Sequence, residues 1–382
     1  MKKIAFLINS FSSGGAEKVL SQIATELSKG YHIYVIMLEN NNFYEPYNLN
    51  TVYLSNDTGG ENGLVKFLKI PFLSYNLIKF IKNNNINIVQ SHIFRANYVN
   101  LLAKLFGSKH EAQIVNTVSI SAKYLKNGLK NRINLLLIKY LYKYADKTIC
   151  KSKEMMVDLK IYSKVDNEYI IYNPYNINTI ESLSNEKVDD FLFDKNQKYL
   201  ITVGRLHQDK NQKFLIKAIE NLIDYHLLII GEGSYEDELV EFTNNLGLQK
   251  RVHFLGRKTN PYKYISKSNF FVSASLAEGF PNVLVEAMIC KIPVIFSDCK
   301  TGPREILAPK TNFLNKLKDG YCIAEFGILF CPYDLKGFIN SIDRLSNDFE
   351  LIKNLKAKGF NRANDFSINK ILYQYKKVLK IE

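Results

Sequence analysis

The segment Glu278–Glu286 places two carboxylates around an expected turn and helix start. We predict a strand that ends near Ser275, and Pro281 suits the first helical position because its fixed φ and missing N–H cost nothing there. The N–H groups of such a helix start, with the helix dipole behind them, favour a pyrophosphate. Glu278 can then lie beside the chemical group that is attached to the phosphate. Glu286, about one turn further, can accept two hydrogen bonds from ribose hydroxyls.

The same segment supplies backbone groups for this predicted phosphate site. Together with the two glutamates, the residues expected to bind the phosphate-bearing ligand are Gly279, Phe280, Pro281, Asn282, Val283 and Leu284. For a bare Glu-x7-Glu pattern, the alternative is an ordinary helix with two solvated glutamates. The Gly-Phe-Pro-Asn sequence and its place after a strand favour the binding interpretation.

Arg205 and Lys210 stand five residues apart in a loop that is predicted to join a strand to a helix. A guanidinium fork and a mobile ammonium can bind a diphosphate from two sides and neutralise the charge of a departing nucleoside diphosphate. They would take the place of a divalent metal, and no Asp-x-Asp occurs in a strand-ending loop. We therefore expect neither a metal nor a cofactor; the alternative is a solvated basic loop.

Two further loops carry weaker signals. Gly14 and Gly15 follow the first expected strand, where a tight turn and a helix N-terminus favour an anion. The pattern is not Gly-x-Gly-x-x-Gly, so a dinucleotide site is disfavoured and a simple turn is the alternative. Gly256 and Arg257 end another expected strand, where Arg257 binds a ligand or is merely solvated.

His92 follows a short expected strand, at the carboxyl edge where doubly wound sheets bind ligands. Ser91, His92 and Arg95 can contact an acceptor or a donor sugar there, whereas the alternative is a packed or capping histidine. The segment Thr301–Leu307 predicts a turn that starts a helix. It lies beside the donor site or is a simple turn.

Strand-length apolar runs alternate with amphipathic helical stretches along the chain, and the pattern starts again near residue 199. Such an order predicts an α/β fold with two Rossmann-like, doubly wound parallel sheets. The expected strands are 3–8, 31–38, 86–90 and 114–118, then 199–203, 226–230, 252–255, 270–273 and 294–297. The expected helices are 14–28, 64–81 and 96–106, then 212–223, 236–246, 260–267 and 281–289.

A length of 382 residues suits two domains. We expect an N-terminal domain over 1–178, a polar linker over 178–197 and a C-terminal domain within 179–365. A terminal helix at about 366–382 can pack back on the first domain. The five cysteines show no metal or disulfide spacing, and the apolar run after Lys3 is too short for a signal peptide. These features favour a cytoplasmic protein.

The net charge of +14 is concentrated, because residues 104–153 hold 11 Lys and Arg against 2 Asp and Glu. Within it, residues 121–145 alternate basic residues with Leu and Tyr, a pattern that can lie on an anionic bilayer. The alternative is a core helix whose solvated face is basic. Nucleic acid is not expected as a partner, since no nucleic-acid motif appears.

Taken in order, several short segments resemble glycosyltransferase family 4, whose members are retaining enzymes with the GT-B fold. The resemblance covers nearly the whole chain. Its segments are Ser13–Glu17, Ile171–Pro174, Val203–Leu206, Asp209–Asn211, Ile230–Gly233, Phe254–Arg257, Glu278–Met288 and Ile292–Ile295. Thr301–Leu307 resembles a subgroup of capsule and lipopolysaccharide enzymes.

The resemblance implies two Rossmann-like domains that face each other across a cleft, with the donor mainly on the C-terminal half. It assigns Arg205 and Lys210 to the donor phosphates and Gly256–Arg257 to the base. It also places Gly14–Gly15 near the donor phosphate and the acceptor. Many members carry a further histidine that contacts the donor sugar, at the position of Asn116–Ser119 here; His92 or Ser119 can substitute for it.

The expected reaction moves N-acetylhexosamine, galactose or glucose from a nucleoside diphosphate, with UDP favoured, to a glycan hydroxyl. The glycan is lipid-linked or belongs to lipopolysaccharide or capsule, and the enzyme acts as a peripheral protein on the inner face of the cytoplasmic membrane. Glu278, Arg205, Lys210 and His92 are the expected catalytic residues. The alternatives are a non-catalytic anion- or membrane-binding protein on the same scaffold and a sugar phosphorylase.

Overall fold

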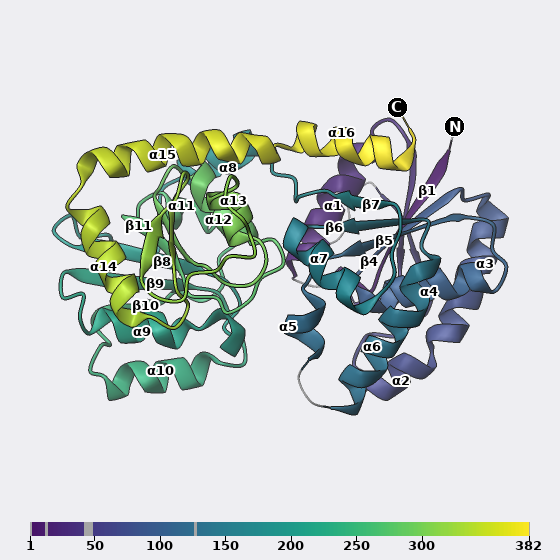
Figure 1. Ribbon diagram of the computed structural model, residues 1–382, viewed down its shortest axis with the longest axis horizontal. Helices are drawn as coiled ribbons and strands as arrows, with labels where there is room; N and C mark the ends of the chain where they lie inside the picture. Colours follow the sequence, from purple (N-terminus) through teal and green to yellow (C-terminus); the bar gives the residue numbers. More distant parts are fainter. Residues whose placement is uncertain (1, 12–13, 42–48, 126–127, 382) are drawn as a thin grey trace. The chain divides into compact units, whose positions relative to one another are not determined.

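Alternating strands and helices build two separate sheets in the computed structural model of the chain (Figure 1). The structure describes residues 2–11, 14–41, 49–125 and 128–381. Two compact units result: unit 1 comprises Met1–Pro174 and Asn369–Glu382, and unit 2 comprises Tyr175–Ile368.

The sheet of unit 1 has seven strands in the order β3-β2-β1-β4-β5-β6-β7, all parallel. This order reverses direction between β1 and β4, the place where doubly wound sheets bind their ligands. The strands are β1 (Lys3–Ile8), β2 (His32–Met37), β3 (Asn50–Tyr53), β4 (Ile88–His92), β5 (Glu111–Asn116), β6 (Lys147–Cys150) and β7 (Glu168–Ile170).

Helices cover both faces of this sheet, because its strands are apolar on both sides. On one face, α3, α4, α6 and α7 enclose a continuous core that includes Leu7, Val89 and Ile114. The helices of unit 1 are α1 (Gly15–Ser28), α2 (Gly63–Leu68), α3 (Ile70–Asn84), α4 (Phe94–Leu105), α5 (Ile120–Tyr124), α6 (Leu129–Leu141), α7 (Lys153–Tyr162) and α16 (Ile368–Leu379), with the 3-10 turn η1 (Tyr142–Tyr144).

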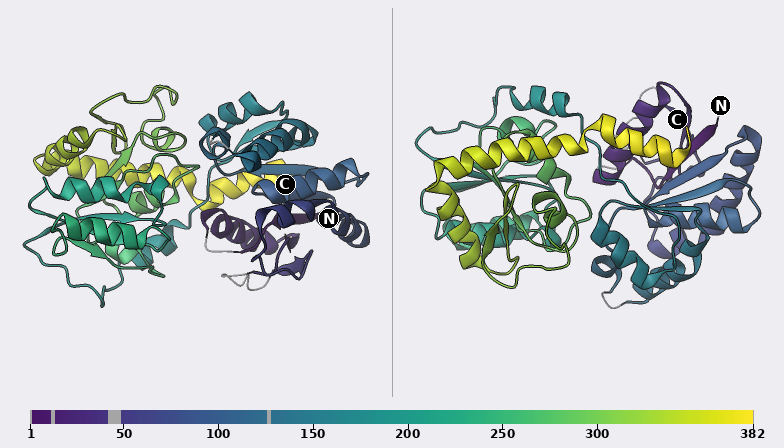
Figure 2. Two further views of the ribbon diagram at one scale, coloured as in Figure 1. Left: turned by 90° about the horizontal axis from the view of Figure 1, so that it is seen from below. Right: turned by 45° about the horizontal axis from the view of Figure 1, so that its top comes forward.

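The C-terminal helix α16 belongs to unit 1 and lies on the opposite face of its sheet, near α1 (Figures 1 and 2). The side chains of Lys147 and Gln113 donate to the Val378 carbonyl, and Lys151 Nζ donates to Tyr375 Oη at 2.6 Å. The helix expected over residues 366–382 is therefore tied to the first sheet by buried polar contacts.

The sheet of unit 2 also has seven strands, in the order β10-β9-β8-β11-β12-β14-β13, and only β13 runs antiparallel. Here the order reverses direction between β8 and β11. The strands are β8 (Lys198–Val203), β9 (Tyr225–Ile230), β10 (Val252–Phe254), β11 (Phe270–Ser273), β12 (Val294–Ser297), β13 (Tyr321–Ile323) and β14 (Ile328–Phe330).

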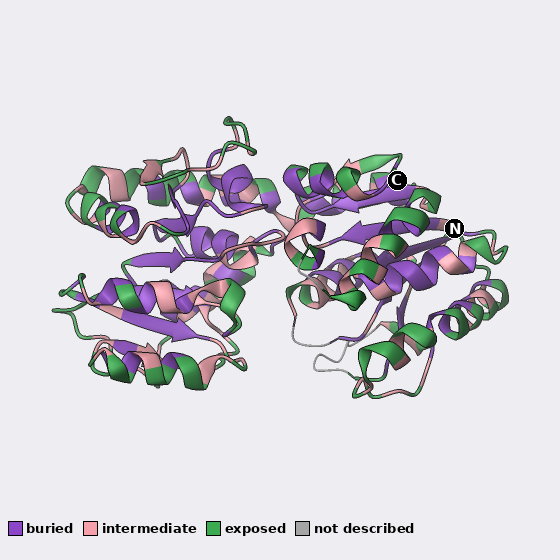
Figure 3. Cartoon of the chain, turned by 60° about the horizontal axis from the view of Figure 1, so that its bottom comes forward, coloured by how far each residue is buried: buried purple, intermediate pink, exposed green. Residues whose placement is uncertain are grey.

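Amphipathic helices cover this second sheet as well, with their buried sides inward and their outer sides exposed (Figure 3). In α14, for example, Phe338, Ile342 and Leu345 are fully buried at helical spacing. The helical segments of unit 2 are α8 (Ile177–Ser184), η2 (Gln208–Lys210), α9 (Gln212–Ile219), α10 (Glu236–Asn245), α11 (Tyr262–Ile265), α12 (Asn282–Ile289), α13 (Pro303–Leu307), α14 (Leu335–Ser346), α15 (Phe349–Ala363) and η3 (Asn364–Phe366).

The segment expected as a linker, residues 178–197, instead begins within helix α8. The division between the units falls at Pro174–Tyr175, and the chain passes back into unit 1 at Ile368–Asn369. These two crossings are neighbours, since Tyr175 N donates to Phe366 O at 2.9 Å and Ile368 N donates to Tyr175 O at 2.8 Å. The linker was predicted from polar composition, which does not reveal that α8 is a helix with a buried side, at Ile180 and Ser184.

Candidate functional site

The loops that follow β8 and β11 carry the strongest predicted site residues, and they are neighbours at the direction change of the second sheet. The Leu276 N–H donates to the Asp209 carbonyl at 2.9 Å, which joins the two loops directly. Residues that are far apart in the sequence therefore meet at one strand edge, where a parallel sheet binds its ligand.

Lys210 and Glu278 form an ion pair at this edge. Lys210 Nζ donates to Glu278 Oε1 at 2.6 Å, and the two side chains are 31% and 9% exposed. The ammonium is thus partly open to solvent, whereas the carboxylate is largely covered. This arrangement holds a cation where an anionic ligand can reach it.

Arg205 leaves the same loop as an exposed side chain. Its backbone carbonyl accepts a hydrogen bond from Gln212 Nε2 at 2.9 Å, which ties the loop to the start of α9. Within the described parts of the chain, no hydrogen bond or ion pair involves the Arg205 guanidinium. The fork therefore has its full capacity for a phosphate.

The Glu278 backbone is held from the loop that follows β12. The Glu278 N–H donates to the Lys300 carbonyl at 3.0 Å, and Thr301 Oγ1 donates to the Glu278 carbonyl. Ala277 and Lys300 also form a short parallel bridge. Both backbone groups of Glu278 are therefore engaged, which restricts where its side chain can lie.

The loop that follows β12 and bonds to the Glu278 backbone has an unusual conformation. Thr301 has φ of 60° and Gly302 has φ of 94°, and a β-branched residue such as Thr rarely adopts a positive φ. A Cβ on Gly302 would lie 2.6 Å from Pro281 Cδ, so only glycine allows the loop to approach the Glu278 segment this closely.

The start of α12 differs from the prediction in one respect. Pro281 is the N-cap, with φ of −72° and ψ of 96°, and the helix begins at Asn282, so the expected first helical position was wrong by one residue. Proline fixes φ but leaves ψ free, and here ψ is extended. Leu284 N donates to the Pro281 carbonyl at 3.1 Å, so this N–H is already paired. The N–H groups that precede Leu284 in the chain are the ones expected to donate to a phosphate.

Phe280 and Glu286 flank this helix start as buried side chains. The Phe280 ring packs edge-on against Phe366, with centroids 5.4 Å apart, and anchors the turn. Glu286 is 6% exposed, and its Oε1 accepts a hydrogen bond from Tyr262 Oη at 3.1 Å. The carboxylate is therefore oriented by a tyrosine from α11 rather than solvated, and its role toward a ribose stays a prediction.

The loop at Gly256 and Arg257 is linked to the loop that follows β9. Gly231 N donates to the Gly256 carbonyl at 2.9 Å, and Arg257 forms an ion pair with Glu232 at 3.1 Å. Gly231 has φ of 146°, and a Cβ there would meet the Gly204 carbonyl at 1.9 Å. These loops pack backbone against backbone beside Arg205, and their contact with a base stays a prediction.

Arg304, from the Thr301–Leu307 motif, has a structural role. Its guanidinium forms a buried ion pair with Asp298, whose Oδ2 also accepts the Leu317 N–H at 2.8 Å. Asp298 has a fully covered side chain and Arg304 an 8% exposed one. The motif therefore fixes the loop that holds Glu278, although its arginine points into an internal ion pair.

In unit 1, Gly14 is the N-cap of α1 and Gly15 is its first residue; Ser12 and Ser13 lie outside the described residues. The Glu17 carboxylate lies close to Gly14, because a Cβ on Gly14 would be 2.2 Å from Glu17 Oε2. This carboxylate already occupies the positive end of the helix. The predicted anion contact would have to displace it.

His92 is the last residue of β4 rather than a loop residue, and it is 1% exposed. Its Nε2 lies 3.2 Å from Gln90 Oε1, and its ring packs edge-on against Phe6. Burial lowers the pKa of His92 well below its usual value, with a smaller contribution from Lys151. The structure thus favours the packed-histidine alternative.

The segment that stands in place of the family histidine is also described. Ser119 caps α5 by accepting the Ala122 N–H, and it donates to Asp158 Oδ2 at 2.9 Å. Ser119 is therefore occupied by structural contacts. Asn116 ends β5, is 2% exposed, and its Nδ2 has no partner in the described chain.

Sequence reasoning missed two residues that orient the predicted site. Tyr262 orients Glu286, and the Thr301 hydroxyl holds the Glu278 carbonyl. Neither contact has a local sequence signal, since each joins two segments more than 20 residues apart in the sequence. The unusual φ of Thr301 appears only in the folded backbone.

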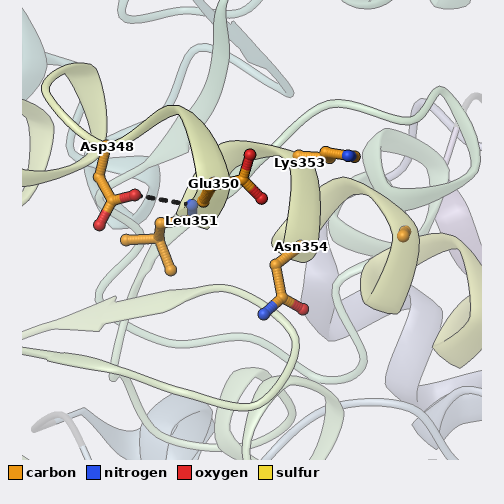
Figure 4. Close-up of a pocket in the computed structure, with 6 residues that line it drawn as sticks. Asp348, Glu350, Leu351, Lys353 and Asn354 are labelled. Carbon is orange, nitrogen blue, oxygen red and sulfur yellow. Dashed lines mark hydrogen bonds between the residues drawn. The ribbon is translucent and has the colours of Figure 1, made fainter.

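A separate cavity of about 480 Å³ lies along the start of α15 (Figure 4). Asp348 caps this helix by accepting the Leu351 N–H at 2.8 Å, and Glu350, Lys353 and Asn354 line the cavity. It contains none of the predicted site residues. Across the described residues, no three His, Cys, Asp or Glu side chains are placed to hold a metal ion.

Comparison with known proteins gives two adjacent family matches. Residues 184–362 match the family described as "Glycosyl transferases group 1", and residues 13–179 match "Glycosyltransferase Family 4". The two matches divide the chain near the boundary between the structural units.

Individual proteins are similar over most of the chain. The N-acetylgalactosamine-N,N'-diacetylbacillosaminyl-diphospho-undecaprenol 4-alpha-N-acetylgalactosaminyltransferase of Campylobacter jejuni is 32% identical over 374 residues, 97% of each chain. The capsular polysaccharide biosynthesis glycosyltransferase CapH of Staphylococcus aureus is 24% identical and covers 82% of this chain and 81% of its own. The crystal structure of Anabaena HepE in complex with UDP has a TM-score of 0.78 over 99% of each chain at 20% identity, which shows a shared fold.

Proposed function

The chain belongs to glycosyltransferase family 4, as a GT-B glycosyltransferase of bacterial polysaccharide biosynthesis, and from this premise we propose that it transfers a sugar from a UDP-sugar to a lipid-linked glycan with retention. The expected family and fold class are thereby confirmed. Donor, acceptor and stereochemistry are the proposed part.

The observation that carries the donor assignment is the Lys210–Glu278 pair beside the exposed Arg205. Two cations on one strand edge can bind a diphosphate and stabilise it as it leaves. Glu278 keeps the ammonium in place and can contact the sugar on the same phosphate. No metal enters this proposal, because the positive charge comes from these side chains.

UDP and a lipid-linked acceptor are supported by the similar proteins. The HepE structure contains UDP, and the Campylobacter enzyme is named for a diphospho-undecaprenol substrate. The sugar we favour is an N-acetylhexosamine, with galactose and glucose as the other candidates. The hydroxyl of the acceptor would attack on the face that the diphosphate leaves, so the leaving phosphate can accept the proton.

We also propose peripheral contact with an anionic membrane through unit 1. On α6, Leu129, Leu136 and Tyr140 are 75%, 53% and 55% exposed. Leu64 and Leu68 on α2 are each 66% exposed. Exposed apolar side chains between lysines are typical of a membrane-surface helix.

These two helices are neighbours within unit 1 (Figure 1). A Cβ on Gly63, the first residue of α2, would lie 3.7 Å from Lys130 Nζ of α6. We call this apolar and basic face of α2 and α6 the docking face. Throughout the described chain, no helix is long and apolar enough to cross a membrane.

A donor screen tests the proposed reaction. The protein is incubated with UDP-, GDP- and ADP-sugars, and release of the nucleoside diphosphate is measured together with the thermal shift that each nucleotide causes. We expect stabilisation by UDP and slow hydrolysis of one UDP-sugar. Tight binding to anionic vesicles without any nucleotide effect would instead support a non-catalytic membrane-binding protein.

A further inference from the structure

Unit 1 carries a second set of polar residues that the donor site does not use, at the direction change of its own sheet. Asn9 follows β1, Ile93 follows β4, and Asn116 ends β5. Strands β1, β4 and β5 are adjacent, and the pairs Leu7–Ser91 and Ser91–Ile114 set their register. The three residues therefore stand side by side at the carboxyl edge of the sheet.

Asn116 points to the face of the sheet that α4 covers. Ile114, two residues before it, belongs to the core beneath α4, and side chains alternate along a strand. The chain bends at Asn9, directly after β1, and the Asn9 carbonyl accepts the Glu39 N–H at 3.0 Å. Asn116 therefore lies on the side where α4 begins, and Asn9 is next to Glu39, the residue that pairs with Arg95 of α4.

Several polar atoms at this edge are buried without a hydrogen-bond partner among the described residues. They are Asn9 Oδ1, Asn116 Nδ2, and Nε and Nη2 of Arg95. Buried polar atoms are almost always paired with protein, water or a ligand, so these atoms have unused hydrogen-bonding capacity. An acceptor, an amide donor and two guanidinium donors concentrated at one edge fit a ligand that carries both hydroxyls and an anion.

The Arg95 side chain provides an edge that can bind an oxyanion. Its Nη1 is paired with Glu39 Oε1 at 2.6 Å, and Glu39 is itself buried. This pair fixes the guanidinium and leaves the Nε–Nη2 edge, which binds two oxygens of a phosphate or carboxylate side by side. Arg95 also lies in the first turn of α4, whose dipole favours negative charge there.

The backbone at this point is strained. Ile93 is the N-cap of α4 with φ of 73°, a conformation that β-branched residues avoid. Such strain concentrates at ligand sites, where the surrounding structure maintains it. It turns the chain sharply between His92 and Arg95, so that the histidine stays in the sheet while the arginine enters the α4 turn.

We propose that Asn9, Arg95 and Asn116 form a subsite for a sugar phosphate, the phosphate-bearing end of the acceptor. The Nε–Nη2 edge of Arg95 holds the phosphate oxygens, and the two amides bind sugar hydroxyls. The proposal rests on the proposed transferase function and adds the chemical class of the acceptor group that unit 1 recognises.

The test measures binding of three probes by calorimetry: N-acetylglucosamine 1-phosphate, farnesyl diphosphate and unphosphorylated N-acetylglucosamine. We expect both phosphates to bind more tightly than the neutral sugar. Arg95→Gln should weaken phosphate binding about 100-fold, and Asn116→Leu about 10-fold for the sugar phosphate, since each removes a buried donor. If farnesyl diphosphate binds more tightly than N-acetylglucosamine 1-phosphate, the phosphate that Arg95 binds belongs to a lipid. If the sugar phosphate binds more tightly, the phosphate belongs to a soluble sugar.

The controls separate this subsite from folding and from the donor site. Lys82→Gln removes an exposed cation of the same unit and should leave the binding of all three probes unchanged. Asn116→Leu keeps the Arg95–Glu39 pair, so it remains informative if Arg95→Gln fails to fold. Stabilisation by UDP, which depends on unit 2, should persist in every variant.

Unchanged phosphate binding in both Arg95→Gln and Asn116→Leu would overturn the subsite, because ordered water alone would then satisfy the buried atoms. A wild-type protein that UDP does not stabilise but that binds the phosphates through Arg95 would overturn only the donor assignment. The two failures are therefore distinguishable.

Discussion

Lys210 and Glu278 lie 68 residues apart in the sequence, and their side chains are joined by a 2.6 Å ion pair at one edge of the second sheet. The pair depends on the adjacency of β8 and β11 and on the contact between Leu276 and Asp209. It combines a partly exposed cation with a largely covered carboxylate, the arrangement that the proposed donor site needs.

Lys210→Ala should lower the rate of donor hydrolysis and of transfer by about 100- to 1,000-fold, because a fixed donor to the leaving phosphate is lost. The measurement is kcat for release of nucleoside diphosphate. Lys213→Ala is the matched control, since Lys213 is a nearby lysine paired with Glu238 instead. Equal rates in the two variants would contradict the role of Lys210.

Thr301→Val should lower kcat by about 10- to 100-fold while the donor KM changes little, because Glu278 loses the hydroxyl that holds its carbonyl. Thr301→Ser keeps the hydroxyl and should restore most of the rate. A valine variant with wild-type kcat, or a serine variant as slow as valine, would show that Thr301 only fills space.

Arg304→Met should reduce the free energy of unfolding by about 3–5 kcal/mol, because it removes the guanidinium that compensates the buried Asp298 carboxylate, and Lys316 Nζ is 4.0 Å away. Urea unfolding followed by circular dichroism measures the change. The exposed pair Lys310–Glu325 provides the control, and Lys310→Met should cost less than about 1 kcal/mol. Similar losses in both variants would contradict the buried-pair interpretation.

Lys151 should make stability depend on pH. Burial lowers the pKa of Lys151 to about 7, from 10.5 in the unfolded chain. Between these values the unfolded chain binds a proton that the folded chain does not, so the free energy of unfolding rises with pH. The slope is up to about 1.4 kcal/mol per pH unit and falls to zero below about pH 7, where both states are charged and the destabilisation by the buried charge is greatest.

Lys151→Met tests this effect by comparing urea unfolding at pH 7 and pH 9. The wild type should gain more stability over this interval than the variant, and the variant should be the more stable at pH 7. Tyr375→Phe removes the partner hydroxyl without changing the charge and serves as control. An identical pH dependence in wild type and Lys151→Met would rule out the lysine as its source.

The docking face should bring the protein to anionic vesicles. In flotation with phosphatidylglycerol vesicles, Leu129→Glu combined with Leu136→Glu should weaken binding at least about 10-fold, because it removes apolar contact and adds repulsion. Leu192→Glu changes an exposed leucine of unit 2 and should have no effect. Loss of binding in the unit 2 variant alone would place the contact elsewhere.

The main elements of the donor half were predictable because their signals are local. A strand, a turn with Gly279 and a helix near Pro281 follow from periodicity and backbone preference, and Arg205 and Lys210 fall in one loop. The linker failed as a prediction because polar composition does not distinguish a loop from a helix with one buried side, such as α8.

The sequence by itself determined the alternation of strands and helices, the two-sheet fold and the residue types of the donor loops, since each follows from short-range patterns of residues. Only the tertiary structure decided which side chains meet. It paired Lys210 with Glu278, buried His92 in the sheet, and paired Arg95 with Glu39. Those outcomes depend on strand order and on backbone angles such as those of Ile93 and Thr301, which long-range packing sets.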